Sequence, residues 1–291
     1  MTGSQAQIAV LQSAEGGPYD EFTREFRQTL RKLTADSTGN TVILVAGTDE
    51  SARLNALESG DLLVAVGTRA CETALNSSTH APILCALIPR VTAEQMTAAH
   101  HPPHKVTALY LDQPFSRYFG LIRLVMPQIK RVGAVLGPVT ANESVALTAA
   151  ADRAHLAMQL SLFDADSENP LPALEQILRN SEVILALPDP AVYNRYTLPP
   201  LLLTTFRYRV PVFGFSPALV NAGALGGIFS TPAQIGRQAA EIALTRQIPS
   251  GGIYPRYFEV RFNPAVADAL DISLPDHKRL DAFLSTQGGA P

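Results

Sequence analysis

The sequence predicts an α/β protein of two similar lobes, each built on a parallel sheet. Short apolar runs bounded by glycine, proline or polar residues recur along the 291 residues, and segments with helical spacing stand between them. Such runs are typical of strands that helices cover on both faces. Residues 100–105 (HHPPHK) interrupt this alternation and separate two series of similar length. Two such series predict two lobes.

In the first series, helical spacing is clearest over residues 19–36, where Phe22, Phe26, Leu30 and Leu33 share one face. Weaker helices are expected over 50–59 and 68–75. The strands expected in this series are residues 7–11, 41–46, 61–66 and 82–88.

The connection at 100–105 holds two prolines, which cannot continue a helix. Its three histidines raise the question of a metal site, but no regular element fixes them and no carboxylate or cysteine lies among them. We therefore expect a solvated loop and no metal.

The second series predicts helices over 115–126, 143–155 and 172–179. Between residues 181 and 244, three apolar runs each end at a turn-forming or polar group and precede a segment that can be helical. The strands expected in the second series are residues 106–111, 131–136, 158–163, 183–187, 210–215, 224–229 and 257–262.

Composition excludes several classes of function. The net charge is −3 and no block of Lys or Arg stands out, which argues against a nucleic-acid partner. No run of 18 apolar residues is present, so no membrane span is expected. The start MTGSQAQ is polar. This leaves a cytoplasmic protein or an exported one whose leader is absent from this sequence.

The two cysteines, Cys71 and Cys85, have neither CxxC nor metal-ligand spacing. Free cysteine is among the most buried residue types, so we expect two separate thiols, one near a helix start and one in a strand. A disulfide would need an oxidising compartment and neighbouring elements.

Polar groups follow many of the predicted strands, and ligands of parallel sheets bind beyond the carboxyl ends of the strands. Helix N-termini there favour an anion such as a carboxylate, Arg90 suits a carboxylate and Asp189 an ammonium group. Phe215 would add an apolar wall. The candidate ligand-binding residues are Gln12, Ser13, Thr68, Arg90, Asp112, Asn142, Asp189, Asn194, Phe215 and Ser216.

The sequence shows neither phosphate-binding glycines in a P-loop or dinucleotide spacing nor a GxSxG or HExxH motif. No cofactor and no catalytic residue are therefore expected. A hydrolase or lyase that uses the strand-end carboxylates is the enzyme alternative, although carboxylates in such positions more often cap helices.

Several segments match one family in order and spacing over about residues 7–276. Among them are residues 8–12 (IAVLQ), 61–68 (DLLVAVGT), 127–138 (PQIKRVGAVLGP), 185–189 (LALPD), 220–225 (VNAGAL) and 260–263 (VRFN). These segments resemble the type I periplasmic solute-binding proteins, in the ABC-transporter substrate-binding group that also contains tryptophan- and tyrosine-binding lipoproteins.

The resemblance implies two Rossmann-like lobes joined by three crossings, with a ligand cleft between them. It implies that lobe 1 comprises residues 1–105 and 232–256, and lobe 2 residues 106–231 and 257–291. It also implies a periplasmic or exported protein, secreted or lipid-anchored in its native form, that hands a small-molecule ligand to an ABC permease. We expect it to act as a monomer. A sensing or accessory module of the same fold, not coupled to transport, is the alternative.

Overall fold

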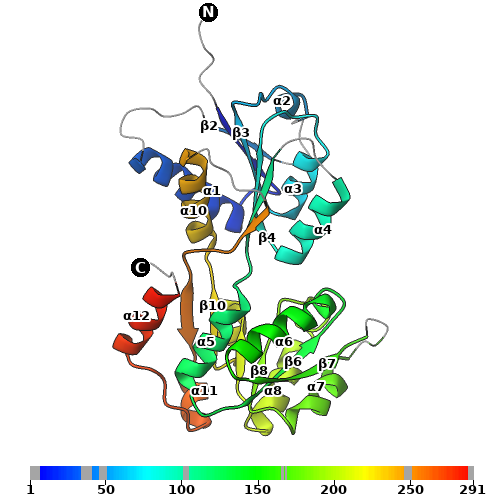
Figure 1. Cartoon of the computed structure of the whole chain (residues 1–291), viewed down its shortest axis with the longest axis vertical. Helices are drawn as coiled ribbons and strands as arrows, with labels where there is room; N and C mark the ends of the chain where they lie inside the picture. The colour runs from blue at the N-terminus through cyan, green and yellow to red at the C-terminus, as the bar shows by residue number, and fades with distance from the viewer. Residues whose placement is uncertain are drawn as a thin grey trace, which may run out of the picture. The chain divides into compact units, whose positions relative to one another are not determined.

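Figure 1 shows a computed structural model of the chain, which describes residues 7–33, 41–45, 51–100, 105–164, 167, 169–245 and 251–287. The chain divides into two compact units. Unit 1 comprises Met1–Asp112 and Ser230–Phe258, and unit 2 comprises Gln113–Phe229 and Glu259–Pro291. The first segment of unit 1 thus ends at Asp112, whereas the lobe 1 expected from the sequence ends at residue 105.

Unit 1 is built on a parallel sheet of the strands β11 (Gly251–Ile253), β5 (Val106–Tyr110), β4 (Ile83–Ile88), β3 (Leu62–Val66), β1 (Ile8–Gln12) and β2 (Thr41–Val45), in that spatial order. Every residue of β1 and β3 is buried, as the continuous apolar runs predict. β5 was expected to open the second series. It pairs with β4 instead, with Val106 opposite Ile83.

Helices cover both faces of this sheet (Figure 1). On one face lie α1 (Gly17–Leu33) and α10 (Pro232–Thr245), whose apolar side chains, including Phe22, Phe26 and Ile235, pack against the strands. The other face carries α3 (Thr68–Leu75) and α4 (Arg90–His100). The short helix α2 (Ser51–Asn55) completes the described helices of the unit.

Gly236 lets α10 approach α1 closely. A Cβ atom at this position would lie 2.4 Å from the backbone oxygen of Phe22. The glycine is therefore part of the packing between two helices that lie far apart in the sequence.

Unit 2 is built on a second sheet, whose strands are β12 (Glu259–Phe262), β10 (Gly226–Phe229), β9 (Val212–Gly214), β8 (Val183–Leu185), β6 (Arg131–Leu136) and β7 (Ala157–Leu162), in that spatial order. Only β12 is antiparallel to its neighbour among these described strands. The helices of the unit are α5 (Phe115–Val125), α6 (Ser144–Arg153), α7 (Leu171–Leu178), α8 (Leu198–Arg207), α9 (Pro217–Ala222), α11 (Pro264–Ala269) and α12 (His277–Thr286), with the 3-10 turn η1 (Ala141–Glu143).

Helices α4 and α12 and strand β11 were not predicted from the sequence. Both helices bury little of their own surface, since Ala93 is the buried residue of α4 and Phe283 that of α12. Without an apolar stripe the helical period is weak in the sequence. β11 has only three residues, two of them glycine, and owes its strand conformation to pairing with β5.

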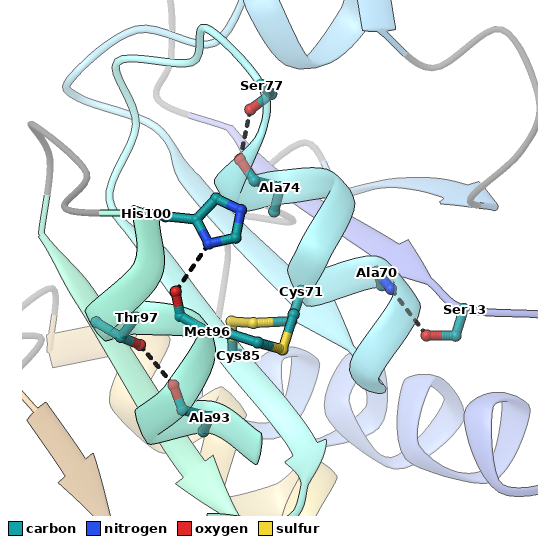
Figure 2. Close-up of a disulfide and its surroundings, with 10 residues drawn as sticks. All are labelled: Ser13, Ala70, Cys71, Ala74, Ser77, Cys85, Ala93, Met96, Thr97 and His100. Carbon is teal, nitrogen blue, oxygen red and sulfur yellow. Dashed lines mark hydrogen bonds between the residues drawn. A yellow bond between two sulfur atoms is a disulfide. The ribbon is translucent and has the colours of Figure 1, made fainter. Parts of the chain in front are cut away.

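The two cysteines form a disulfide, contrary to the expectation of separate thiols. Cys71 on α3 and Cys85 on β4 are joined with a Cα–Cα distance of 5.4 Å (Figure 2). The expectation was wrong because α3 packs directly against β4 and brings the two side chains together in the core of unit 1. A disulfide requires that the elements carrying the two cysteines be neighbours, and the sequence did not determine whether α3 and β4 are.

Candidate functional site

The candidate residues of unit 1 lie along one edge of its sheet. Strands β5, β4, β3 and β1 are parallel neighbours, so their carboxyl ends meet at the same edge. Gln12 is the last residue of β1, and the other candidates stand within two residues of the ends of their strands. The residues brought to this edge are Gln12, Ser13, Thr68, Arg90 and Asp112.

Gln12 and Ser13 are buried and hold the fold together. The Gln12 Nε2 group donates hydrogen bonds to Thr23 Oγ1 at 2.7 Å and to the Tyr19 backbone oxygen at 3.0 Å, both on α1. Ser13 Oγ accepts a hydrogen bond from the backbone N–H of Ala70 at 2.9 Å, which satisfies a donor in the first turn of α3 (Figure 2). These contacts assign both side chains to positioning α1 and α3.

Thr68 is different, because it is exposed and is the first residue of α3. The preceding Gly67 has φ of 92°, and a Cβ there would lie 2.5 Å from Ser13 Oγ. Only glycine suits both conditions. The turn therefore presents the Thr68 hydroxyl at a helix N-terminus, where the helix dipole favours a negative charge.

Arg90 and Asp112 belong to one polar group. Asp112 Oδ2 accepts a hydrogen bond from the backbone N–H of Arg90 at 2.6 Å, at the start of α4. The Arg90 guanidinium pairs with Glu94 at 2.9 Å, and the Tyr110 hydroxyl donates to Glu94 at 3.3 Å. Burial raises the pKa of the Asp112 carboxyl. Burial first, and then the charge of Glu94, raise the pKa of Tyr110 to about 12.

Sequence reasoning missed Glu94, which sets the position of the Arg90 side chain. The signal was present, since acid and base stand four residues apart on one helix face. It went unused because α4 itself was not predicted.

In unit 2 the candidates follow three neighbouring strands. Asn142 comes after β6, Asp189 and Asn194 after β8, and Phe215 and Ser216 after β9. Parallel pairing of β8 with both β6 and β9 brings these segments to one edge of the second sheet.

Asp189 is almost fully buried, with 1% of its surface exposed. Its Oδ2 atom accepts from the backbone N–H groups of Val139 and Thr140 and from the Thr140 hydroxyl, each at 3.0 Å. Its Oδ1 atom accepts from the Ala191 N–H at 3.0 Å. Four donors thus share this carboxylate, three of them on Oδ2 and one on Oδ1. The carboxylate therefore ties the segment after β6 to the segment after β8.

Tyr193 and Phe215 form a half-buried aromatic pair close to Asp189. Their ring centroids lie 6.3 Å apart at an angle of 68°, an edge-to-face contact. Burial, and secondarily the charge of Asp189, raise the pKa of the Tyr193 hydroxyl. The pair presents partly exposed aromatic surface at this edge of the sheet.

Asn194 and Ser216 act as local caps. Asn194 Oδ1 accepts from the N–H groups of Tyr196 and Thr197, and its Nδ2 donates to the Pro190 oxygen at 3.0 Å. Ser216 is the N-cap of α9 and accepts from the Leu219 N–H at 3.3 Å. Asn142, in contrast, is exposed on η1.

Replacing Ser216 with alanine is expected to lower the free energy of unfolding by about 1 kcal/mol, the usual cost of losing such a cap. Urea unfolding followed by circular dichroism measures the change. Ser78→Ala, at an exposed serine of unit 1, is the control. Equal stability of Ser216→Ala and the wild type would contradict the capping role.

Among the described residues, no group of three or more His, Cys, Asp and Glu side chains lies close enough to hold a metal ion. His101 and His104 of the histidine-rich connection lie outside the described residues. In His100, Nδ1 lies 2.8 Å from the Met96 oxygen (Figure 2). Its Nε2 lies 3.1 Å from Asn76 Oδ1. No described helix is both long and apolar enough to cross a membrane.

Comparison with known proteins identifies a family. A family model described as ABC transporter substrate binding protein matches residues 20–261. A search of curated proteins gives no match.

Solved structures with similar folds cover nearly the whole chain. A ligand-free, open substrate-binding protein with adhesive properties from Clostridium difficile has a TM-score of 0.70 at 17% identity, over 94% of this chain and 97% of that one. A domain from Streptococcus pneumonia in complex with L-Trp has a TM-score of 0.60 at 17% identity, over 96% and 98%. A conserved domain protein from Vibrio cholerae has a TM-score of 0.61 at 19% identity, over 96% and 98%.

Identities this low establish likeness of fold, whereas the family model matches the sequence itself. The architecture of the chain agrees with the family match. It has two units with mainly parallel sheets, and the chain passes from one unit to the other after Asp112, Phe229 and Phe258. The chain belongs to the family of ABC transporter substrate-binding proteins and has the type I periplasmic binding protein fold.

Proposed function

We propose that this protein is the substrate-binding component of an ABC-type uptake system, that it binds a small polar organic solute, an amino acid or a related compound, and that it passes this solute to a membrane permease. The family match over residues 20–261 supports the transport role. The family is one of substrate-binding proteins, so the proposal includes no chemical step.

The single observation that carries the site assignment is the Gly67–Thr68 turn. It exposes a hydroxyl group at the N-terminus of α3, at the strand edge where Arg90 also lies. A hydroxyl, an arginine and a helix N-terminus together favour a carboxylate. In unit 2, the exposed Asn142 and the partly exposed Tyr193–Phe215 pair supply a polar and an aromatic contact.

Hydrogen bonds within the protein divide the ten candidate ligand-binding residues into two groups. Gln12, Ser13, Asp112, Asp189, Asn194 and Ser216 use side-chain atoms to hold their own loops and helices. We propose that these six shape the site, that Thr68, Asn142 and Phe215 contact the solute, and that Arg90 does so while its guanidinium remains paired with Glu94.

Isothermal titration against panels of amino acids and organic anions tests this proposal. Thr68→Val keeps the size of the side chain and removes its hydroxyl. It is expected to weaken binding of an anionic solute about tenfold or more, as loss of a hydrogen bond to a charged group does. Thr73→Val, on the same helix but away from its N-terminus, is the matched control and should bind as the wild type does. Equal affinities of the Thr68→Val and Thr73→Val variants would contradict the assignment of Thr68 as a solute contact. If no compound of the panels binds, the proposal of an amino acid or related compound as the solute is contradicted.

We also propose a periplasmic or otherwise exported location, with the protein acting as a monomer. The disulfide between Cys71 and Cys85 supports export, because such bonds persist in oxidising compartments. A lipid anchor on the precursor would be compatible with this location.

A further inference from the structure

The outward face of α1 concentrates positive charge. Arg24, Arg27, Gln28, Arg31 and Lys32 are all exposed and follow one another at helical spacing, so that they share one side of the helix. They line a shallow hollow of about 440 Å³. We call these five residues the basic face of α1.

The four cations of this face have no acidic partner within the described part of the chain, where the ion pairs involve arginines of other elements. The acids of α1 make hydrogen bonds of their own. Asp20, in the first turn, accepts from the Gln12 side chain at 3.5 Å. Glu25 accepts a hydrogen bond from the Thr29 hydroxyl at 3.2 Å, and Glu21 accepts from the Ala233 N–H at 3.4 Å. The charge of the basic face is therefore available to an external anion.

Helix stability explains only part of this arrangement. Arg31 and Lys32 lie in the last turn, where positive charge complements the helix dipole. Arg24 and Arg27 lie in the middle of the helix, beyond the reach of that effect. The whole chain has a net charge of −3, so this positive patch stands on an otherwise acidic protein.

The position of the patch leaves the candidate site accessible. Since β1 and β2 are parallel, α1 between them must run back along the sheet, away from the strand carboxyl ends. The cations lie from the middle of α1 to its C-terminal end, and thus toward the opposite edge of unit 1 from Thr68 and Arg90. A partner on this patch would not cover those residues.

We propose that the basic face of α1 binds the anionic headgroups of a lipid membrane. The five side chains include no aromatic or aliphatic anchor, whereas protein interfaces rely on such residues at their centre. Arginine side chains suit phosphate groups, which they bind through paired hydrogen bonds. The four cations lie on the exposed, polar face of an amphipathic helix, and four is the smallest number in clusters that bind anionic lipid surfaces.

Vesicle co-sedimentation tests the proposal. The wild type should bind vesicles of phosphatidylcholine mixed with phosphatidylglycerol and should not bind vesicles of phosphatidylcholine alone. Replacing Arg24, Arg27, Arg31 and Lys32 with glutamine should reduce binding by about fivefold per cation, several hundredfold in total. Raising the ionic strength from about 0.1 M to about 1 M should also release the protein, because the Debye length falls from about 10 Å to about 3 Å.

The matched control replaces four exposed cations that are scattered over unit 2, Arg153, Arg179, Arg207 and Lys278, with glutamine. It changes the net charge equally and should bind the anionic vesicles as the wild type does. Thermal unfolding verifies that both variants are folded. The proposal is overturned if the wild type ignores anionic vesicles, if it binds neutral ones equally well, or if both variants lose binding to the same extent. The lipid proposal is also overturned if the wild type does not bind anionic vesicles but binds an acidic permease, and if the α1 variant loses that binding. The basic face of α1 would then serve a protein partner.

Discussion

Asp189→Ala is expected to lower the free energy of unfolding by about 3–5 kcal/mol, because it leaves the four donors around this buried carboxylate without their acceptor. The N–H groups of Val139 and Thr140 on one loop, and that of Ala191 on another, all donate to this carboxylate. Asp189→Asn should lose less, since the amide keeps one oxygen acceptor but turns an NH2 group toward N–H donors. Equilibrium urea unfolding measures both losses.

The same experiment separates a structural role of Asp189 from direct contact with the solute. Asp281→Ala, at an exposed carboxylate on α12, is the control and should change stability by less than about 0.5 kcal/mol. If Asp189→Ala unfolds like the wild type and loses only solute affinity, the carboxylate serves as a ligand contact and the structural assignment is wrong.

The crowding around Asp189 explains why a glycine stands at position 137. A Cβ atom on Gly137 would lie 2.6 Å from Asp189 Oδ1. The turn after β6 therefore depends on glycine for close approach of the carboxylate, and on the carboxylate for its hydrogen bonds.

Removal of the disulfide is expected to cost about 3 kcal/mol of stability. The bond closes a loop between residues 14 apart in the sequence, and a loop of about 15 residues corresponds to about 3 kcal/mol in the chain-entropy description. The Cys71→Ala/Cys85→Ala double variant should therefore unfold at a lower urea concentration than the oxidised wild type.

A reductant provides the internal control for this prediction. Dithiothreitol should lower the unfolding midpoint of the wild type and leave that of the double variant unchanged. Both cysteines are almost fully buried, at 2% and 1% exposure, so reduction of the native protein should be slow and should accelerate in urea. A wild-type midpoint that is the same with and without reductant would contradict a stabilising disulfide.

Most of the strands were predictable because burial on both faces leaves a local signature. Residues 62–66 and 131–136, for example, are nearly continuous apolar runs between turn formers, and both are strands. The placement of polar groups at strand carboxyl ends was predictable for the same reason. Parallel order then brings Thr68 and Arg90 to one edge without any further signal in the chain.

Helix α4 and strand β11 were not predictable, because their conformation is stabilised by neighbours more than by their own residues. The sequence of α4 carries little apolar periodicity, and β11 begins with two glycines. The sequence of β5 likewise does not determine which sheet it joins, because its apolar run suits either lobe equally well. Pairing with β4 places it in unit 1.

The local pattern of apolar runs and turn formers was sufficient for the α/β class and the two lobes, and the order and spacing of particular segments carried the family resemblance. The folded chain was needed for the disulfide and for the role of Asp189, because both depend on groups that are distant in the sequence. Val139 and Thr140 stand 50 and 49 residues before Asp189, yet their N–H groups use its acceptors. A sequence shows which polar groups follow the strands, while the packing of separate loops determines which of them remain available to a solute.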